Sequence, residues 1–298
     1  MHNEINLQRG TWNPIQYTEL LYADDTVLIT NNVNAMNRFL AKVQEHASYF
    51  GLKFNEGKCA AMTINADGIL RFRNGEKVPK VNSTVYLGAN INDKDDPKQD
   101  VNTRLGACFS LLNKLDYFWR KSNCTVKFKL DVFDAVVRSK LVYSLEAVQL
   151  PPSLLKKLNS IQFKGLRKIL NIEHTYVNRA NTNESILQRA NQYKNPRHLP
   201  GKNILPFSAY VHKKQEQLLK HVVRSPNADP LRQAMLQEST PYPVVTEKRR
   251  VGRPKQLWTH EVYKRIWNAS GLGSQNAFEV DSRACIARMA DNIYNRSL

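Results

Sequence analysis

The sequence predicts an α+β protein in three successive parts: an antiparallel hairpin sheet with a helix over residues 1–92, an all-α bundle over 93–172, and a loosely ordered basic region over 173–298. Short β-rich runs separated by turn residues occupy the first part, as in a sheet built from hairpins. Apolar residues at helical spacing occupy the second part. Proline and asparagine interrupt the third. With 298 residues, the chain is long enough for one large domain or two ordinary ones.

A β-hairpin followed by a helix is predicted first. Two β-rich runs, YTELLY and TVLIT, flank the small and acidic Ala23-Asp24-Asp25, which is a hairpin signal. From Met36 to Phe50 the apolar residues recur at helical spacing, and Gly51 ends this predicted helix. Further short strands complete the predicted sheet, two of them around the tight-turn dipeptide Asn74-Gly75. Their segments are 52–54, 59–64, 69–72, 78–81 and 85–88.

The second part is predicted to be a small helical bundle. Apolar faces at helical spacing run through 101–119 and 130–141, and a third stripe runs from Leu154 to Leu170 after Pro151-Pro152. Beyond the bundle, the Asn- and Pro-rich segment 173–206 predicts a linker or a loosely ordered stretch. Two more helices are predicted, over 209–223 and 256–267, with Trp258 and Trp267 placed for packing.

Charge is distributed unevenly along the chain. The formal net charge is +18, of which residues 1–150 contribute +3 and residues 151–298 contribute +15. A basic half joined to a nearly neutral half indicates a polyanionic partner, and nucleic acid is the commonest one. The alternative is a solvated basic surface that keeps the protein soluble.

The sequence offers no membrane or secretion signal. No apolar run approaches the roughly 20 residues that a membrane span requires, and the N-terminus has no apolar signal core. Four cysteines lie far apart without metal-ligand spacing, so free thiols in a reducing compartment are expected. We therefore expect an intracellular protein, in the nucleus or the cytoplasm, without a membrane partner.

The tetrapeptide Tyr22-Ala23-Asp24-Asp25 carries the chemistry. Two adjacent carboxylates at a turn repel each other unless a cation offsets their charge, and Mg²⁺ prefers carboxylate and phosphate oxygens. Two such ions can hold the attacking and leaving oxygens of a phosphoryl transfer. The alternative is an exposed acidic turn without a catalytic role.

The neighbouring segments give this tetrapeptide a context. YADD, FGLKFNEGKC and VYLG follow one another in the order and spacing of motifs C, D and E of reverse transcriptases. KLVYSLE and LNSIQFKGLRKIL resemble the thumb of non-LTR (LINE-type) retrotransposon reverse transcriptases, and RRVGRPKQLW is similar to a basic segment downstream of that thumb. The chain thus resembles the C-terminal palm and thumb of this family, an RNA-directed DNA polymerase, over about residues 12–172 and, more weakly, 247–267.

This resemblance implies site residues, cofactors and partners. Asp24 and Asp25 would bind Mg²⁺ or Mn²⁺, and Lys58 would protonate the pyrophosphate leaving group. Tyr86, Leu87 and Gly88 would form the primer grip. The partners would be an RNA template, a DNA primer and deoxynucleoside triphosphates. The cations expected to contact nucleic acid are Lys156, Lys157, Lys164, Arg167, Lys168, Arg249, Arg250 and Arg253.

Each of these roles has a plain alternative. Lys58 can be an ordinary loop lysine, Tyr86 and Leu87 can belong to an apolar core, and the basic helix can present a merely solvated face. The sequence also departs from the family pattern. Only 21 residues precede Tyr22, too few for the fingers, motif A and motif B, and none of them is an aspartate.

Three interpretations follow from this departure. The chain is expected to be a fragment or decayed form of a polymerase that performs two-metal nucleotidyl transfer at full length, and to be inactive alone. The first alternative is a catalytically dead nucleic-acid-binding remnant. The second, a group II intron-type enzyme, shares YADD but fits the thumb less well.

Overall fold

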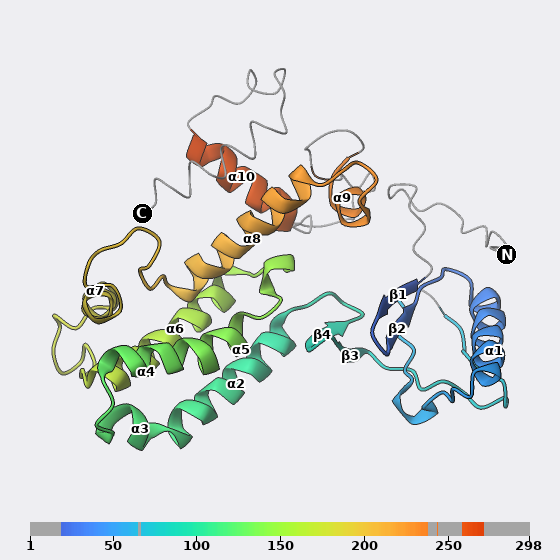
Figure 1. Cartoon of the computed structure of the whole chain (residues 1–298), viewed down its shortest axis with the longest axis horizontal. Coiled ribbons are helices and arrows are strands. Elements are labelled where there is room, and N and C mark those ends of the chain that lie inside the picture. Colours follow the sequence, from blue (N-terminus) through green and yellow to red (C-terminus); the bar gives the residue numbers. More distant parts are fainter. Residues whose placement is uncertain (1–18, 65–66, 238–242, 244–257, 271–298) are drawn as a thin grey trace. The chain divides into compact units, whose positions relative to one another are not determined.

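The computed structural model describes residues 19–64, 67–237, 243 and 258–270. Within these ranges the protein is mostly helical, with two small antiparallel hairpins near the N-terminus (Figure 1). The chain divides into two compact units, residues 1–96 and 97–298. We call them the hairpin unit and the helical unit.

The hairpin unit contains two separate two-stranded sheets. Strand β1 (Glu19–Tyr22) pairs with β2 (Asp25–Leu28), and β3 (Ser83–Tyr86) pairs with β4 (Ala89–Asn92), both antiparallel. The single larger sheet predicted from the sequence is therefore not formed among the described residues. Of the other predicted strands, the described residues show only the isolated bridges Ala61↔Lys80 and Arg71↔Lys77.

Side chains of helix α1 (Val33–Tyr49) replace the missing sheet partners. The Asn37 side chain accepts a hydrogen bond from the backbone N–H of Arg71 (2.8 Å) and donates one to the Ile69 carbonyl (3.3 Å). Gln44 accepts from the N–H of Arg73 (2.9 Å). Backbone groups need partners, and amide side chains on a helix supply them here as well as a strand would. Segment 69–73 can therefore follow α1 without joining a sheet.

The local predictions in this unit hold where they depend on short-range geometry. The predicted helix is α1, which Asn32 caps through its side chain, and Gly51 follows it with a φ of +70°. The predicted turn at Asn74-Gly75 is present, with Gly75 donating to the Phe72 carbonyl (2.9 Å). A small core beneath them comprises Leu40, Phe72 and Val78, with Leu28, Phe54, Cys59, Ala61 and Leu70 packed against it.

The helical unit is a bundle built around one central helix, α6 (Pro152–Leu170). It packs against α2 (Lys98–Lys114), α3 (Asp116–Lys121), α4 (Val126–Phe133), α7 (Asn183–Lys194) and α8 (Phe207–Arg224) (Figure 1). Pro152 begins α6 and Asn171 ends it in the left-handed conformation, where the Ile172 N–H returns to the Arg167 carbonyl (2.9 Å). A π-helical turn (Asp134–Arg138) joins α4 to α5 (Ser139–Val142).

The apolar core of the bundle surrounds Trp119, Phe133 and Phe207. The Phe133 and Phe207 rings stack with 6.0 Å between their centroids, and Trp119 meets Phe133 edge-on at 6.3 Å. A second cluster lies between α8, α9 (Pro230–Met235) and α10 (Trp258–Ser270). Its buried members are Leu219, Val222, Val223, Leu236, Val262 and Ile266.

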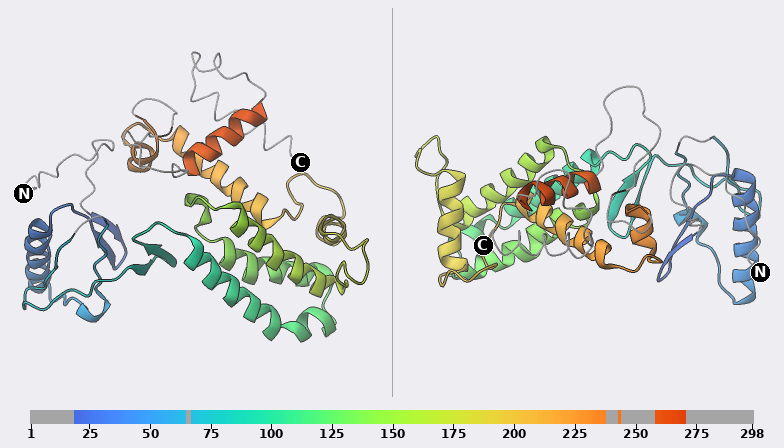
Figure 2. Two further views of the ribbon diagram at one scale, coloured as in Figure 1. Left: turned by 180° about the vertical axis from the view of Figure 1, so that it is seen from behind. Right: turned by 90° about the horizontal axis from the view of Figure 1, so that it is seen from above.

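The structure corrects the predicted linker at 173–206. This segment contains α7, and Ile186 and Ala190 of that helix are completely buried in the main core. Figure 1 views α7 along its axis while α4 and α6 are seen from the side, and Figure 2 shows α7 lying across the end of the bundle. Two buried apolar residues on a crossing helix give too weak a periodicity to be read from the sequence.

The later helices agree with their predictions. The helix predicted at 209–223 is α8, and the one at 256–267 corresponds to α10, where Trp258 packs against the second cluster. The side chain of Trp267 lies outside the part that the structure describes. The basic segment 249–255 also lies outside the described residues.

Candidate metal turn and nucleic-acid interface

The two aspartates lie at the tip of the β1–β2 hairpin. Tyr22 pairs with Asp25, so Ala23 and Asp24 form a two-residue turn, and Ala23 has a φ of +51°. A left-handed alanine costs on the order of 1 kcal/mol relative to glycine or asparagine, and such strain gathers at functional sites. Asp24, Asp25 and the neighbouring Tyr22 are all exposed. The turn therefore has a strained backbone and exposes two carboxylates to solvent.

The turn meets only part of the requirement for a two-metal site. Two adjacent carboxylates can bind a hard cation, but among the described residues no group of three or more His, Cys, Asp or Glu side chains could hold a metal ion. The described residues thus supply two carboxylates and not the larger set that bridges two ions in phosphoryl transfer.

Lys58 does not interact with the two aspartates in the described part of the chain. It ends a 3₁₀ turn, Glu56–Lys58, with its side chain exposed and its backbone N–H bonded to the Asn55 carbonyl (2.9 Å). Within the described part of the chain, no ion pair joins Lys58 to Asp24 or Asp25. Its assignment as a proton donor remains a prediction.

The residues predicted to form the primer grip lie at a turn and not in the predicted continuous strand. Tyr86 ends β3, and Leu87 (φ +48°) and Gly88 (φ +78°) connect it to Ala89. Two successive positive φ values define the type I′ turn that suits a two-residue hairpin. Tyr86 and Leu87 are half-buried. The strand predicted through residue 88 therefore ends at Tyr86, because Leu87 and Gly88 in the left-handed conformation reverse the chain into β4.

Three of the five α6 cations point toward α2 and α3. Lys157 donates to the Asn102 side chain (3.1 Å), Lys164 lies over the Phe109 ring (3.9 Å from its centroid), and Lys168 reaches Asn113 (3.3 Å). Each pair is separated by 55 residues, which shows that α2 and α6 run parallel and in register. Heptad-like spacing of these lysines fits a helix–helix seam.

Lys168 is the most firmly held of the three. It forms an ion pair with Asp116, and its side chain is only 12% exposed. The hydrogen bond from Lys168 holds the pKa of the Asp116 carboxyl below its ordinary value. A lysine committed to this pair would have to give up an internal partner to meet a phosphate.

Arg167 is committed on another side of α6. Its guanidinium donates to the Asn181 carbonyl (3.3 Å) and to the Asn183 side chain (3.0 Å), and burial lowers its pKa. It thereby fastens the loop between α6 and α7. Of the five predicted α6 contacts, Lys156 and Lys157 are the most exposed. Arg249, Arg250 and Arg253 lie outside the described residues.

A basic surface lies on α7 and the loop that follows it, and it was not predicted from the sequence. From Ser185 to Gln215 the chain contains no Asp or Glu but six Lys or Arg residues and two His residues. Arg189, Arg197 and Lys202 are exposed. The excess of basic residues in this segment is visible in the sequence. Because the segment was predicted to be a linker, a folded basic surface was not expected there.

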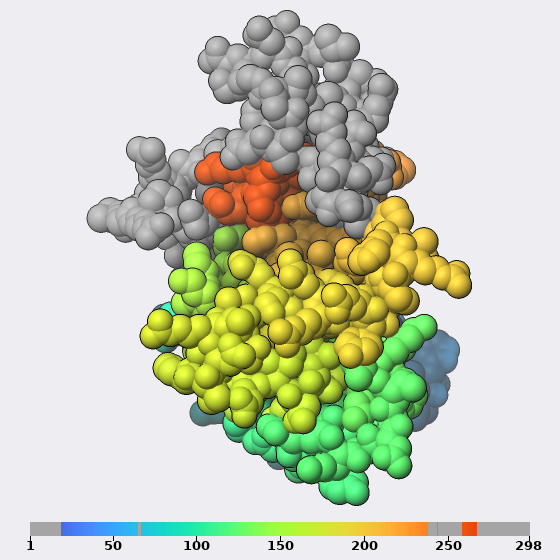
Figure 3. Space-filling model, turned by 90° about the vertical axis from the view of Figure 1, so that its left-hand side faces the viewer, coloured from blue at the N-terminus to red at the C-terminus, as the bar shows by residue number. Residues whose placement is uncertain are grey.

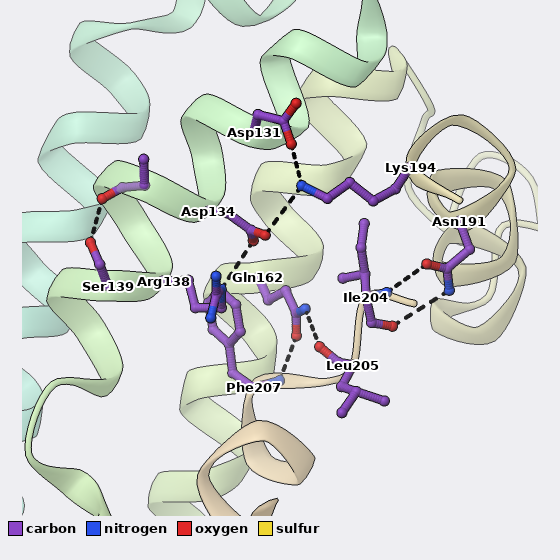
Figure 4. Close-up of polar contacts among 11 residues, drawn as sticks. Asp131, Asp134, Arg138, Ser139, Gln162, Asn191, Lys194, Ile204, Leu205 and Phe207 are labelled. Carbon is purple, nitrogen blue, oxygen red and sulfur yellow. Dashed lines mark hydrogen bonds and ion pairs between the residues drawn. The ribbon is translucent and has the colours of Figure 1, made fainter. Parts of the chain in front are cut away.

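Side-chain amides hold this segment in place (Figure 4). Gln162 of α6 donates to the Leu205 carbonyl (2.8 Å) and accepts from the Phe207 N–H (2.7 Å). Asn191 accepts from the Ile204 N–H (2.7 Å) and lies within 3.5 Å of its carbonyl. Lys194 forms ion pairs with Asp131 of α4 and with Asp134 of the π-helical turn that follows α4.

The charge imbalance follows the boundary between the two units. Residues 1–96 hold 10 Lys and Arg against 11 Asp and Glu, a net charge of −1, whereas residues 97–298 hold 34 against 15, a net charge of +19. The whole basic excess therefore belongs to the helical unit. No helix among the described residues is long and apolar enough to cross a membrane.

Comparisons with known proteins agree with the N-terminal motifs. Residues 1–91 match the family model of reverse transcriptase (RNA-dependent DNA polymerase). A transposon-derived protein of Caenorhabditis elegans is 22% identical over 254 residues, which is 84% of this chain and 85% of that protein. Residues 1–96 are too few to hold this alignment, so it extends through much of the helical unit. Residues 1–91 thus carry a reverse transcriptase-family domain, in a chain distantly homologous to a transposon-derived protein.

Proposed function

We propose that this chain binds nucleic acid through its helical unit, and that these 298 residues do not by themselves catalyse DNA synthesis. The observation that carries the proposal is the net charge of +19 on the helical unit, in the same chain as a reverse transcriptase-family domain. Lysine and arginine that neutralise phosphates supply most of the affinity of sequence-independent binding. The partner class is a template–primer duplex or its single strands.

The finer assignment is that the hairpin unit corresponds to the end of the palm and the α2–α6 bundle to the thumb of a non-LTR retrotransposon enzyme. The two-residue turns at YADD and at VYLG support it, since both place their motif residues at hairpin tips. In the full-length family, Asp24 and Asp25 would bind Mg²⁺ or Mn²⁺, which would supply charge neutralisation for nucleotidyl transfer.

The inactivity that we expect of this chain rests on its carboxylate set. Positioning the nucleotide and two metal ions together supplies most of the rate in this chemistry. Two exposed carboxylates on a hairpin tip hold a hard cation weakly, because water competes for it from every side. Lys58, which makes no ion pair with either aspartate in the described structure, gives the site no further order.

Two measurements test the proposal on the whole chain. Fluorescence anisotropy with a labelled RNA–DNA hybrid should show binding that weakens steeply with salt and hardly depends on sequence. Primer extension with Mg²⁺ or Mn²⁺ should show no synthesis above background. Absence of binding at low salt would refute the binding proposal.

RNA-directed DNA synthesis is the second candidate function, and the family match over residues 1–91 favours it. Extension that disappears in both Asp24→Asn and Asp25→Asn proteins would establish it. The asparagine side chain keeps the size and removes the charge, so loss of extension would point to the metal and not to misfolding. Matching far-UV circular dichroism spectra would serve as the folding control.

A further inference from the structure

We propose that α7 and the loop at 195–206 form a preorganised surface for the phosphate backbone of nucleic acid. This inference rests on the proposed function and gives it a location. The surface consists of Arg189 and Tyr193 on α7 and Arg197, His198 and Lys202 on the loop. Figure 3 shows the yellow segment that contains α7 spread across the face turned to the viewer.

The first support is that the loop has a fixed shape although most of it is exposed. The Asn195 side chain accepts from the Leu199 N–H (2.8 Å) and donates to the Leu199 carbonyl (2.9 Å) and to the Asn203 side chain (2.7 Å). Asn195 is itself only 3% exposed. Buried amides that bind a loop's backbone remove much of its freedom, so ordering it on a ligand costs less.

The far end of the loop is fixed to the bundle. Asn191 and Gln162 hold residues 204–207, and the Asn159 side chain of α6 pairs with both the N–H and the hydroxyl of Ser208 (2.9 Å each). Between these anchors His198 adopts a φ of +49°. A non-glycine residue in this conformation is strained, and surrounding contacts must maintain it.

The second support is that the basic side chains of α7 and the loop fall into two groups, one bound to acidic residues of the protein and one exposed. Lys194 is used internally, since its ammonium lies between Asp131 and Asp134 (Figure 4). Arg189, Arg197 and Lys202 are exposed, and within the described residues none of them has an ion pair. The sequence from Ser185 to Gln215 contains no acidic residue, and the one acidic residue of α7 is Glu184 in its first turn. The side chains of the exposed group are therefore available to an anion.

The third support concerns the class of anion. Arg189 and Tyr193 are four residues apart on α7 and share one face of the helix, where Tyr193 is 50% exposed. An arginine fork suits a phosphate, and an exposed aromatic ring beside it suits an unpaired base. An acidic protein could form ion pairs with the arginine and lysine side chains, but it has no base to stack on the Tyr193 ring. Nucleic acid with a single-stranded portion is therefore the favoured partner.

The test compares two triple variants of the full chain that remove the same charge. One is Arg189→Gln, Arg197→Gln and Lys202→Gln. The control is Lys121→Gln, Lys127→Gln and Lys140→Gln, which alters exposed lysines on α3, α4 and α5. Anisotropy is measured over a range of salt concentrations with labelled single-stranded RNA, single-stranded DNA and an RNA–DNA hybrid of one sequence, and circular dichroism confirms that both variants fold.

We expect the α7-loop variant to bind at least about tenfold more weakly, with a salt slope reduced by about 2 to 3, as for three lost phosphate contacts. The control should stay within about threefold of the unmodified chain. A Tyr193→Leu variant should bind single-stranded RNA and single-stranded DNA more weakly, and its affinity for the hybrid should be unchanged. Which single strand loses more then distinguishes RNA from DNA as the preferred partner.

The outcomes separate this inference from the proposed function. If the unmodified chain binds no nucleic acid, the proposed function fails. If it binds and both triple variants weaken equally, only the overall charge matters and the α7-loop surface is refuted. If the α7-loop variant keeps its nucleic-acid affinity but loses binding to poly-glutamate, the surface serves an acidic protein and the inference is again overturned.

Discussion

Gly165 is the position in the helical unit where one methyl group should have the largest measurable effect. It lies in the interior of α6, where alanine normally stabilises a helix by about 1 kcal/mol relative to glycine. At this position a Cβ atom would lie 2.2 Å and 2.8 Å from two carbons of the Phe133 ring. Ordinary contacts between such atoms begin near 3.5 Å, so the ring or the helix must move by about 1 Å.

The Phe133 ring has little room to move. It is 2% exposed, stacks on Phe207 and meets Trp119 edge-on. Inserting a methyl group into such a core costs about 1–3 kcal/mol, and the closeness of the clash places Gly165→Ala at the upper end. After the helix-propensity gain of about 1 kcal/mol is subtracted, we expect a net destabilisation of about 2 kcal/mol.

A matched control exists in the same unit. Gly106 lies in the interior of α2, is exposed, and a Cβ atom there would meet nothing within 4 Å. Gly106→Ala should therefore stabilise the unit by about 1 kcal/mol through propensity alone. The two substitutions are chemically identical and should have opposite signs, with a difference of about 3 kcal/mol between them.

Urea denaturation followed by far-UV circular dichroism measures this difference on the full chain. The transition midpoint should fall for Gly165→Ala and rise for Gly106→Ala at an unchanged m-value. In thermal melts, about 2 kcal/mol in a unit of this size corresponds to about 4–8 °C. Phe133→Leu in the Gly165→Ala background should recover part of the loss. Equal stabilisation by both alanines would refute the packing described here.

Three further predictions concern single polar groups. Arg167→Lys should speed amide exchange in the loop at 173–181, because one guanidinium nitrogen makes both contacts to Asn181 and Asn183 and the shorter lysine side chain does not reach that position, whereas Lys156→Gln should leave the exchange unchanged. Asn195→Ala should expose the Leu199 amide to fast exchange and weaken nucleic-acid binding without changing the net charge; protection equal to that of the unmodified chain would contradict the role of Asn195. Burial, with help from Arg265, lowers the pKa of His212 to about 4, so the unfolded chain binds the proton first and stability should fall as the pH drops from about 6.5 to 4. His212→Gln should reduce that fall in acid titrations followed by circular dichroism, and an unchanged profile would show that His212 is not its source.

The local features of the fold could be predicted from the sequence. The acidic hairpin, the helix from Met36 to Phe50 and the Asn74-Gly75 turn each depend on residues within a few positions of one another. The bundle helices were equally accessible, because a stripe of apolar residues with a period near 3.6 is a local signal. The pairing of distant strands could not be predicted from the sequence, because amide side chains of α1 can satisfy the same backbone groups.

The residues of the candidate site also fall into those that local sequence predicts and those that depend on tertiary packing. Asp24-Asp25 was found because its chemistry and its turn lie in one tetrapeptide. Arg167 and Lys168 were assigned to nucleic acid because helical spacing places them on a basic helix, but spacing does not say what the helix packs against. The α7 surface could not be predicted from the sequence, because the contacts that fix it to the bundle come from α4 and α6, far away in the sequence.

The sequence by itself determined the identity of the motifs, the helical segments that have a clear apolar stripe, and the basic excess, all of which are properties of composition and short-range order. Only the tertiary structure decided which cations are available. Lys164 and Lys168 are half-buried against Phe109 and Asn113 because α2 and α6 pack in parallel. Arg189, Arg197 and Lys202, by contrast, stay exposed on α7 and the loop that follows it. The physical reason is that a charge is satisfied by whatever neighbour packing brings within about 4 Å, and local periodicity cannot specify that neighbour.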